Sequence, residues 1–522
     1  MKRAEKKVKG ANNFFSRFKK FGTIKYILLI YVLFTVVMSL LLLWPITHNK
    51  DKMAQLKFNY GDAIFIASSA FSNTGLSTFP IADAFNEFGQ AIIAICILAG
   101  GFGIFTIKVY IVQTIFGLKA TIFNSKVTQV ERGNNTWGDT KKLIKVSITI
   151  LLITLIISSI IFTIIFYTSP YGKFDDTKAA SINNENIFNP YDYQKYNPYH
   201  NFNRSIKYAI FHSISALNNA GFDIMGTKNL APFYSDFSIQ IFTLILIFIG
   251  GVGYPVIYDV YCKLKSLKKT EPRHRFSLFT KLTLITYLSV TIIGLTFTLI
   301  FELSNKNPNA FWNQPSYGSP FEKLFAMYFQ TKSTRSAGFS TIDYHHFTKQ
   351  TILIHSILMF IGFSPVSTAG GIRNITIAII FLSIITMLRG RKSIIAFKRQ
   401  IGKETLIKAT TIFAIGIFLV FIGTLIAYSV TTLETYKSGT NELDLTKKQY
   451  DFIDVLFEIC SAFGNAGLST GITTKITTSM KLMLIVYMFI GQFGIQQTIL
   501  FWGNTHKKAE HYHYIYEDVA IG

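Results

Sequence analysis

The sequence predicts an all-α integral membrane protein. In it, four similar units, each a span, a short helix, a turn and a second span, surround one pseudo-four-fold axis. Half of the 522 residues are hydrophobic and only 15% are charged. The hydrophobic residues form long runs, and a helix of about 20 such residues crosses a hydrocarbon core of about 30 Å. Eight runs have about this length or more: 25–44, 88–107, 146–169, 237–258, 282–301, 351–388, 409–433 and 482–502.

The charged residues predict how these spans are oriented. The net charge is +24. Basic residues cluster in segments that pairs of spans separate: 1–20, 119–145, 263–281 and 389–408. Because Lys and Arg stay on the cytoplasmic side of a membrane, we expect both termini in the cytoplasm of a multi-pass plasma-membrane protein. These clusters suit anionic lipid, and we do not expect nucleic-acid binding.

Four short segments align without gaps and define the repeated unit: 69–78 (SAFSNTGLST), 215–224 (SALNNAGFDI), 332–341 (KSTRSAGFST) and 461–470 (SAFGNAGLST). A stretch too short to cross a bilayer leads into each copy: 60–71, 206–217, 321–332 and 451–462. The predicted chain order is as follows: a basic N-terminus at 1–21, units at 22–115, 140–262, 278–390 and 405–503, and a cytoplasmic tail at 504–522.

The four turns predict a path for a cation. Irregular backbone at membrane depth must be buried in protein or line water, so the turns should face one another. Glycine allows positive φ and leaves the backbone carbonyls free to point inward, where a ring of them replaces the hydration shell of K⁺. The short helices would direct their partly negative C-terminal ends to the same place. A helical bundle with four unrelated loops is one alternative, and an inverted-repeat transporter is another, although the latter predicts two related halves.

Glycine motifs recur in the second span of each unit: 98–103 (LAGGFG), 248–253 (FIGGVG), 360–362 (FIG) and 489–494 (FIGQFG). Glycines in membrane helices usually allow helices to pack closely, and this is the interpretation we favour for the motif.

The run at 351–388 is too long for a single span. As one helix it would measure about 57 Å, nearly twice the hydrocarbon core. Pro365 removes a backbone donor and Gly370-Gly371 adds flexibility. We therefore predict a break over 362–372, forming a loop that could plug the path from below.

Several charged residues lie beside the turns. Asp223 and Asp343 follow the second and third turns and are candidates for concentrating cations at the outer mouth, although they are equally compatible with solvated loop positions. A positive charge facing the ion would be unfavourable. We therefore expect Arg335 to turn away from the axis and to pair with a carboxylate such as Glu458 or Glu322.

The turns, among them 333–341 (STRSAGFST) of the third unit, the glycine motifs and one further segment, 362–373 (GFSPVSTAGGIR), resemble the Trk/Ktr/HKT superfamily over residues 22–503. The similarity is greatest to the Ktr-type (KtrB-like) membrane subunit of potassium uptake systems. The resemblance implies a K⁺ filter made of Asn73, Thr74, Gly75, Asn219, Ala220, Gly221, Ser336, Ala337, Gly338, Asn465, Ala466 and Gly467. It implies a gating loop that includes Gly362, Ser364, Pro365, Ser367, Thr368, Ala369, Gly370 and Gly371. Glycine in all four turns goes with K⁺ preference in that family, whereas Na⁺-carrying relatives have serine in the first.

The same resemblance implies partners for the chain. These are a second copy of the chain, with one pore in each subunit, and a separate cytoplasmic nucleotide-binding subunit of the KtrA/TrkA type. The sequence itself contains no Walker A motif and no dinucleotide-binding G-x-G-x-x-G motif. We expect no cofactor in this chain and no metal beyond the transported K⁺, and Na⁺ stays open as a coupling ion.

One residue departs from the family pattern. Gln492 stands where relatives have an arginine that is thought to touch the gating loop. We expect a gate that closes less tightly or is held by other contacts.

Two alternatives differ from this interpretation. One is a Na⁺-permeable transporter of the same architecture. The other is a membrane enzyme, which the sequence disfavours because it contains no HExxH motif and no His or Cys residues clustered at the spacing of metal ligands.

Overall fold

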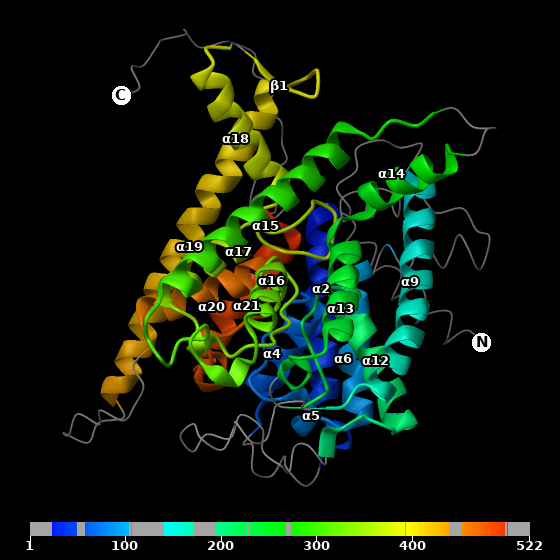
Figure 1. The fold of residues 1–522 in the computed structure, drawn as a ribbon, viewed down its shortest axis with the longest axis vertical. Coiled ribbons are helices and arrows are strands. Elements are labelled where there is room, and N and C mark those ends of the chain that lie inside the picture. Colours follow the sequence, from blue (N-terminus) through cyan, green and yellow to red (C-terminus); the bar gives the residue numbers. More distant parts are fainter. Residues whose placement is uncertain are drawn as a thin grey trace, which may run out of the picture.

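In the computed structural model the regular secondary structure of the described residues is helical except for one short β-hairpin (Figure 1). The structure describes residues 23–103, 140–171, 195–267, 273–437 and 450–495, except for 50–57, 227–228 and 392, together with residues 106 and 498. The predicted segments 1–21 and 504–522 lie outside the described residues, as do 107–115 of the first unit and 499–503 of the fourth.

Each predicted unit contains a long helix, a short helix and a second apolar helix. The first has α2 (Thr23–Leu43), α4 (Tyr60–Phe71) and α6 (Glu87–Phe102), and the second has α9 (Thr140–Thr168), α12 (Phe202–Leu217) and α13 (Phe237–Gly251). The third has α15 (Leu278–Ser304), α16 (Pro320–Ser333) and α17 (Lys349–Phe360), and the fourth has α19 (Lys403–Lys437), α20 (Phe452–Gly464) and α21 (Thr478–Phe493). Outside this pattern lie α5 (Ile81–Ala84), α14 (Tyr254–Lys265), α18 (Asn374–Leu388) and a hairpin of β1 (Ile394–Ala396) and β2 (Arg399–Ile401).

Three helices are by themselves long and apolar enough to cross a membrane: Lys142–Thr168, Leu278–Ser304 and Lys403–Val430. Four shorter apolar helices accompany them among the described residues: Ile27–Leu43, Glu87–Phe102, Asn374–Leu388 and Thr478–Phe493.

The four short helices α4, α12, α16 and α20 begin at polar caps. In α4 the Asn59 side chain accepts from the backbone of Asp62 while Asp62 accepts in return, and α16 and α20 begin with the same reciprocal arrangement. Such caps satisfy backbone N–H groups that a helix start leaves free, and carboxylates favour the positive end of the helix dipole. These starts explain why stretches too short to span a bilayer still form stable helices.

The units close into a cycle through their second helices. Each second helix packs on the short helix of the next unit: α6 on α12, α13 on α16, α17 on α20, and α21 back on α4. Two ion pairs reinforce these contacts. Lys481 of α21 lies 2.7 Å from Asp62 of α4, and Lys349 of α17 lies 2.6 Å from Asp454 of α20. The last unit therefore returns to the first.

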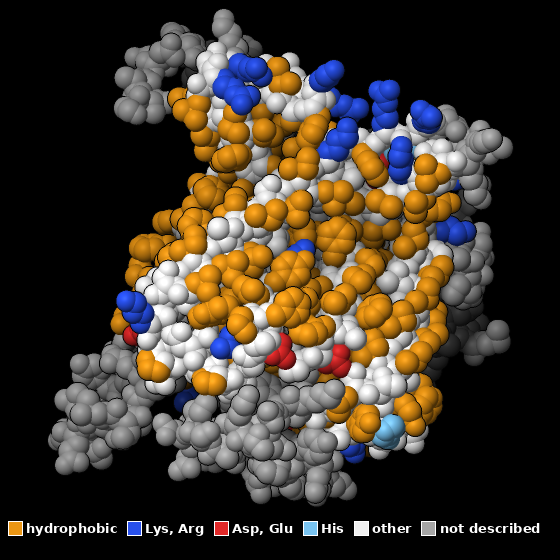
Figure 2. Space-filling model, viewed as in Figure 1, with side chains coloured by type: hydrophobic (Ala, Val, Ile, Leu, Met, Phe, Trp, Pro, Cys, Tyr) orange, Lys and Arg blue, Asp and Glu red, His pale blue; other side chains and the backbone are white. Residues whose placement is uncertain are grey.

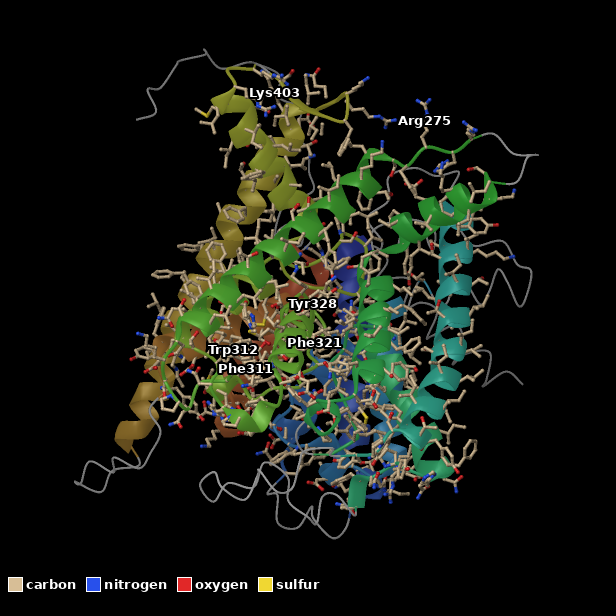
Figure 3. The ribbon with its side chains drawn as sticks, viewed as in Figure 1. Arg275, Phe311, Trp312, Phe321, Tyr328 and Lys403 are labelled. Carbon is tan, nitrogen blue, oxygen red and sulfur yellow. The ribbon has the colours of Figure 1, made fainter. Side chains whose placement is uncertain are left out.

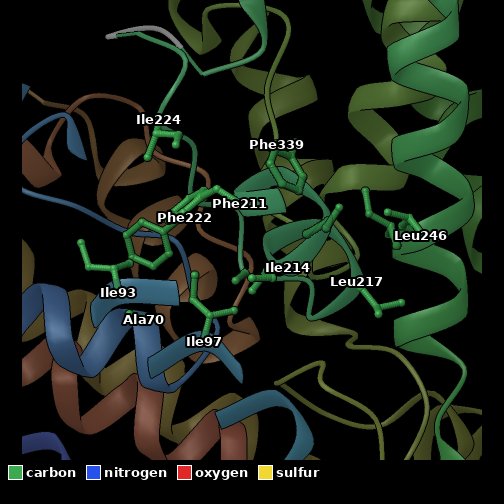
Figure 4. Packing of buried hydrophobic residues seen from close by; sticks show 14 of the residues in the cluster. Ala70, Ile93, Ile97, Phe211, Ile214, Leu217, Phe222, Ile224, Leu246 and Phe339 are labelled. Atoms are coloured by element: carbon green, nitrogen blue, oxygen red, sulfur yellow. The ribbon is translucent and has the colours of Figure 1, made fainter. Parts of the chain in front are cut away.

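The first and second units share a hydrophobic core (Figure 4). Ala70 of α4 and Ile93 and Ile97 of α6 face side chains of α12 such as Ile214 across this core, and Phe339 joins it from the third turn. Close van der Waals packing of such side chains stabilises the contact between helices that lie in a membrane.

The second span of the second unit differs from the prediction. The expected run 237–258 is two helices, α13 and α14, at an angle of 100°. The cause is Gly253, whose φ of 82° ends the helix although hydrophobic residues continue. The corresponding Gly103 and Gly494 follow the ends of α6 and α21 with φ of 79° and 86°, so these helices also stop earlier than predicted.

The run 351–388 is broken as its length suggested. Helix α17 ends at Phe360 and α18 begins at Asn374, with an irregular loop, hereafter loop 361–373, between them. A parallel bridge between Ile361 and Ile372 closes the base of this loop.

The surface separates by charge (Figure 2). Hydrophobic side chains cover the middle of the molecule, and Lys and Arg gather at the end where α14 and β1 lie. Arg275 and Lys403, from two different basic segments, both lie at this end (Figure 3). The two segments thus share one side, as the charge pattern requires.

The Lys481–Asp62 pair yields a stability prediction. In Lys481→Met the Asp62 carboxylate, whose side chain is 2% exposed, loses its cation. Removing one partner of a buried pair costs about 3–5 kcal/mol, so the midpoint of thermal unfolding in detergent should fall clearly.

The matched control is Lys207→Met, because Lys207 pairs with Glu87 at 3.2 Å and the Glu87 side chain is 84% exposed. Exposed pairs contribute about 0–1 kcal/mol. Adding Asp62→Asn to Lys481→Met should recover much of the loss. Equal midpoints for the two lysine variants would contradict the assignment.

Candidate functional site

The four predicted turns meet in one ring, hereafter the glycine ring. Its members have positive φ of 95° at Gly75, 69° at Gly221, 73° at Gly338 and 77° at Gly467. A Cβ added at one glycine would lie very close to the carbonyl oxygen of the residue before the next glycine. The added Cβ would be 2.5 Å from the Ala220 oxygen at Gly75, 2.8 Å from the Ala337 oxygen at Gly221 and 2.6 Å from the Ala466 oxygen at Gly338. At Gly467 it would overlap the Thr74 oxygen, which closes the ring. Side chains are excluded at these positions, so the ring is built of backbone.

The residues two places before each glycine hold the ring from outside. Asn73, Asn219 and Asn465 have φ of 53°, 55° and 49°, a left-handed conformation that asparagine tolerates better than most residues. The Asn465 amide donates to the Ser72 carbonyl of the first turn at 2.6 Å, and the Asn219 amide lies 3.1 Å from the Thr368 hydroxyl. These side chains thus tie the turns to neighbouring segments.

In the third turn Ser336 takes the place of these asparagines, with φ of 123°. Its hydroxyl lies 3.5 Å from the Asn465 carbonyl oxygen, so it contacts the fourth turn. All twelve predicted filter residues therefore lie in the ring or directly behind it.

The glycine motifs of the second spans serve close packing, as we favoured. A Cβ at Gly100, Gly250 or Gly491 would overlap the carbonyl oxygen of Phe71, Leu217 or Phe463. Each of these carbonyls belongs to the C-terminal turn of the short helix in the same unit. In the first, second and fourth units the motif therefore lets the end of the short helix contact the span directly, whereas Gly362 of the third unit lies against Gly370 of the following loop.

Loop 361–373 contacts the second and fourth turns, and it also accepts a hydrogen bond from Arg335 of the third turn. Its Gly371 N–H donates to the Phe463 carbonyl at 3.0 Å, and a Cβ at Gly370 would lie 2.6 Å from the Asn465 side chain. On the other side, the Thr368 hydroxyl lies near Asn219, as described above. Of the predicted gating residues, Thr368, Gly370 and Gly371 thus lie directly against the second or fourth turn.

The loop is also tied to itself and to α14. The Ser367 hydroxyl donates to the Ser364 carbonyl at 2.7 Å, and Arg373 donates to the Ala369 carbonyl. A Cβ at Gly253 would lie 2.8 Å from the Pro365 oxygen, and one at Gly362 would overlap the Gly370 oxygen. The loop is therefore compact and abuts the bend between α13 and α14.

Arg335 pairs with neither Glu458 nor Glu322, and within the described residues it forms no ion pair with a carboxylate, so the expected pairing was wrong. It is 1% exposed, donates to the Gly362 carbonyl at 2.8 Å and lies 5.6 Å from the centre of the Tyr287 ring. Glu458 instead accepts from Ser469, Thr470 and Thr473 behind the fourth turn, and Glu322 caps its own helix. A carbonyl dipole and an aromatic face stabilise the guanidinium here.

Gln492 contacts the loop only through its backbone. Its carbonyl accepts from Arg373 at 3.0 Å, whereas its side-chain amide donates to the Phe71 carbonyl at 3.0 Å. Arg373 is therefore a contact between loop and span that we did not single out, although it is the only charge within the run 351–388.

A cavity of about 340 Å³ lies above the glycine ring and is lined by all four ring glycines. Asp223 and Asp343 both line it, and no Lys or Arg is among its described lining residues. Each carboxylate also accepts a nearby backbone N–H, from Met225 at 3.1 Å and from His345 at 3.0 Å. The arrangement combines carbonyl oxygens with negative charge, which suits a cation.

The packing motif can be tested by adding one methyl group. In Gly250→Ala the new Cβ overlaps the Leu217 carbonyl, so α12 and α13 must separate. Overpacking of this kind costs about 1–3 kcal/mol, and a lower midpoint of thermal unfolding is expected.

Gly402→Ala is the matched control, since its Cβ would meet nothing closer than the Thr405 hydroxyl at 3.9 Å. Its midpoint should stay close to that of the unmodified chain. An unchanged midpoint of thermal unfolding in Gly250→Ala would show that the close contact between α12 and α13 does not exist.

Comparison with known proteins agrees with this geometry. Over 89% of its length the chain is 33% identical to an uncharacterized cation transporter of Mycoplasma genitalium, of which it covers 88%. It is 31% identical to the Ktr system potassium uptake protein D of Bacillus subtilis, with 95% of this chain and 96% of that protein covered. The crystal structure of the potassium transporter TrkH from Vibrio parahaemolyticus has the same fold, with a TM-score of 0.60, 16% identity and coverage of 92% and 85%. Residues 33–512 match the TrkH family of cation transport proteins, and the chain belongs to that family.

Proposed function

We propose that this chain is the pore-forming subunit of a K⁺ uptake system and that K⁺ passes through the glycine ring. The observation that carries the proposal is the closure of four glycine turns into one backbone ring beneath an acidic cavity. Carbonyl rings replace the hydration shell of K⁺, and the C-terminal ends of four short helices supply further negative potential. The name of the Bacillus subtilis relative, a potassium uptake protein, supports K⁺ as the ion.

The architecture in this proposal has eight spans and four pore units. The cyclic packing of α6, α13, α17 and α21 on the next short helix supports one pseudo-four-fold pore. The basic end with α14 and β1 is then cytoplasmic, by the preference of Lys and Arg for that side. From the charge pattern of the sequence we expect both termini in the cytoplasm as well.

Loop 361–373 acts as the gate in this proposal. It lies against the second and fourth turns, and the bonds from Arg335 and Arg373 hold its two ends. A second copy of the chain and a cytoplasmic nucleotide-binding subunit complete the system. The name of the relative, which describes a Ktr system, supports further components.

A Na⁺-permeable transporter of the same architecture is the second candidate. The difference between the two rests on the first turn, where Gly75 leaves no side chain at the ring. Cation competition during uptake separates them.

The first functional prediction concerns Gly75→Ser in a K⁺-transport-deficient cell. The serine Cβ would lie 2.5 Å from the Ala220 oxygen at φ of 95°, so it must displace ring carbonyls. The unmodified chain should restore K⁺ uptake, and the variant should lose K⁺ over Na⁺ preference about tenfold, equivalent to about 1.4 kcal/mol.

Gly402→Ser, which lies away from the ring in open surroundings, should keep the original preference. The amount of each variant in the membrane is measured in parallel. A K⁺ preference indifferent to Gly75, with equal protein amounts, would refute the filter.

The second functional prediction concerns Gln492→Arg. An arginine adds a positive charge beside the path and further donors toward loop 361–373, and both oppose cation passage. Basal K⁺ flux should therefore fall severalfold, while Gln400→Arg on the exposed hairpin leaves it unchanged. Unchanged basal flux in Gln492→Arg would remove this residue from the gate.

A further inference from the structure

Asn229 contacts two members of the glycine ring from the outer cavity, although it belongs to neither turn. Its side-chain Nδ2 donates to the Gly221 carbonyl at 3.2 Å and lies 3.4 Å from the Gly338 carbonyl. Asn229 is half-buried and lines the cavity above the ring. It therefore bridges the second and third turns.

The orientation of this amide is fixed by backbone donors. The Asn229 Oδ1 accepts from the Leu230 N–H at 2.8 Å and from the Ser340 N–H at 3.4 Å. Leu230 in turn donates to the Ser340 carbonyl at 3.1 Å, which joins the two segments. Since the oxygen faces two N–H groups, the NH₂ group must face the carbonyls.

The contact makes the ring unequal. Within the described part of the chain, no side chain donates to the carbonyls of Gly75 or Gly467. The carbonyls of Gly221 and Gly338 thus face the Asn229 amide, and those of Gly75 and Gly467 have no such donor among the described residues. A carbonyl that already accepts a hydrogen bond offers a weaker field to a cation than a free one.

We infer that Asn229 is a positioning residue that weakens the outermost cation site on the side of the second and third turns. The inference rests on the proposed function. Because the number and field strength of the carbonyls set the affinity and selectivity of such a site, Asn229 determines how tightly the first ion is held. It also keeps the site weak enough for the ion to leave toward the next position.

Two variants distinguish the loss of the Asn229 hydrogen-bond donor from a general effect on folding. Asn229→Gly removes the amide without strain, because the φ of 53° at this position suits glycine. Asn229→Asp keeps the shape but replaces the donor by a negatively charged acceptor. Thr474→Ala is the control, since Thr474 lines the same cavity but its hydroxyl donates to Gly471 at 3.0 Å.

The experiment measures K⁺ uptake against K⁺ concentration, Na⁺ competition and membrane protein amount. Asn229→Gly should lower the half-saturating K⁺ concentration by about two- to tenfold, and Asn229→Asp should lower it further and narrow the preference for K⁺ over Na⁺. The maximal rate per protein should change less, and Thr474→Ala should match the unmodified chain.

Half-saturating concentrations that are unchanged or raised in both Asn229 variants would overturn the inference. The Gly75→Ser variant distinguishes a failure of the proposed function from a failure of this inference. If its preference for K⁺ over Na⁺ is unchanged, the glycine ring is not the filter, whatever the result for the Asn229 variants.

Discussion

The structure depends on the burial of four irregular turns inside the protein. In hydrocarbon an unsatisfied backbone group costs several kcal/mol, so each turn needs neighbours that are protein. The glycine ring meets this need by making every turn the neighbour of the next, from Gly75 through Gly221 and Gly338 to Gly467 and back. The cyclic packing of second helices on short helices, closed by Lys481 and Asp62, holds the four turns at that distance.

The glycines of the second spans solve a related problem. The last carbonyls of a helix have no partners within it, and here they lie against spans that approach at Gly100, Gly250 and Gly491. Because the span has no Cβ there, its backbone comes close enough to fix the end of the short helix, and with it the turn that follows. One small residue in each of these spans thus sets the geometry of the ring.

Much of this arrangement could be predicted from the sequence, because the four aligned segments define the units and the lengths of the hydrophobic runs define the spans. The four short helices end within a few residues of the predicted positions, and Pro365 with Gly370-Gly371 revealed the break after α17. The bend at Gly253 was not predicted, because the hydrophobic residues continue on both sides of it. The partners of Arg335 and the contacts of Asn229 also escaped, since a bond to a backbone carbonyl leaves no complementary charge in the sequence.

Loop 361–373 is where the units act on one another. Gly362 is held by Arg335 of the third unit, and Arg373 reaches the carbonyl of Gln492 in the fourth. From the second unit, the Tyr254 N–H lies 3.4 Å from the Val366 carbonyl, at the first residue of α14. Helix α14 leaves α13 at 100° and lies toward the basic end, so a single helix joins that end to the middle of the loop. The bend that interrupts the second span is thus what connects the basic surface with the segment beneath the ring.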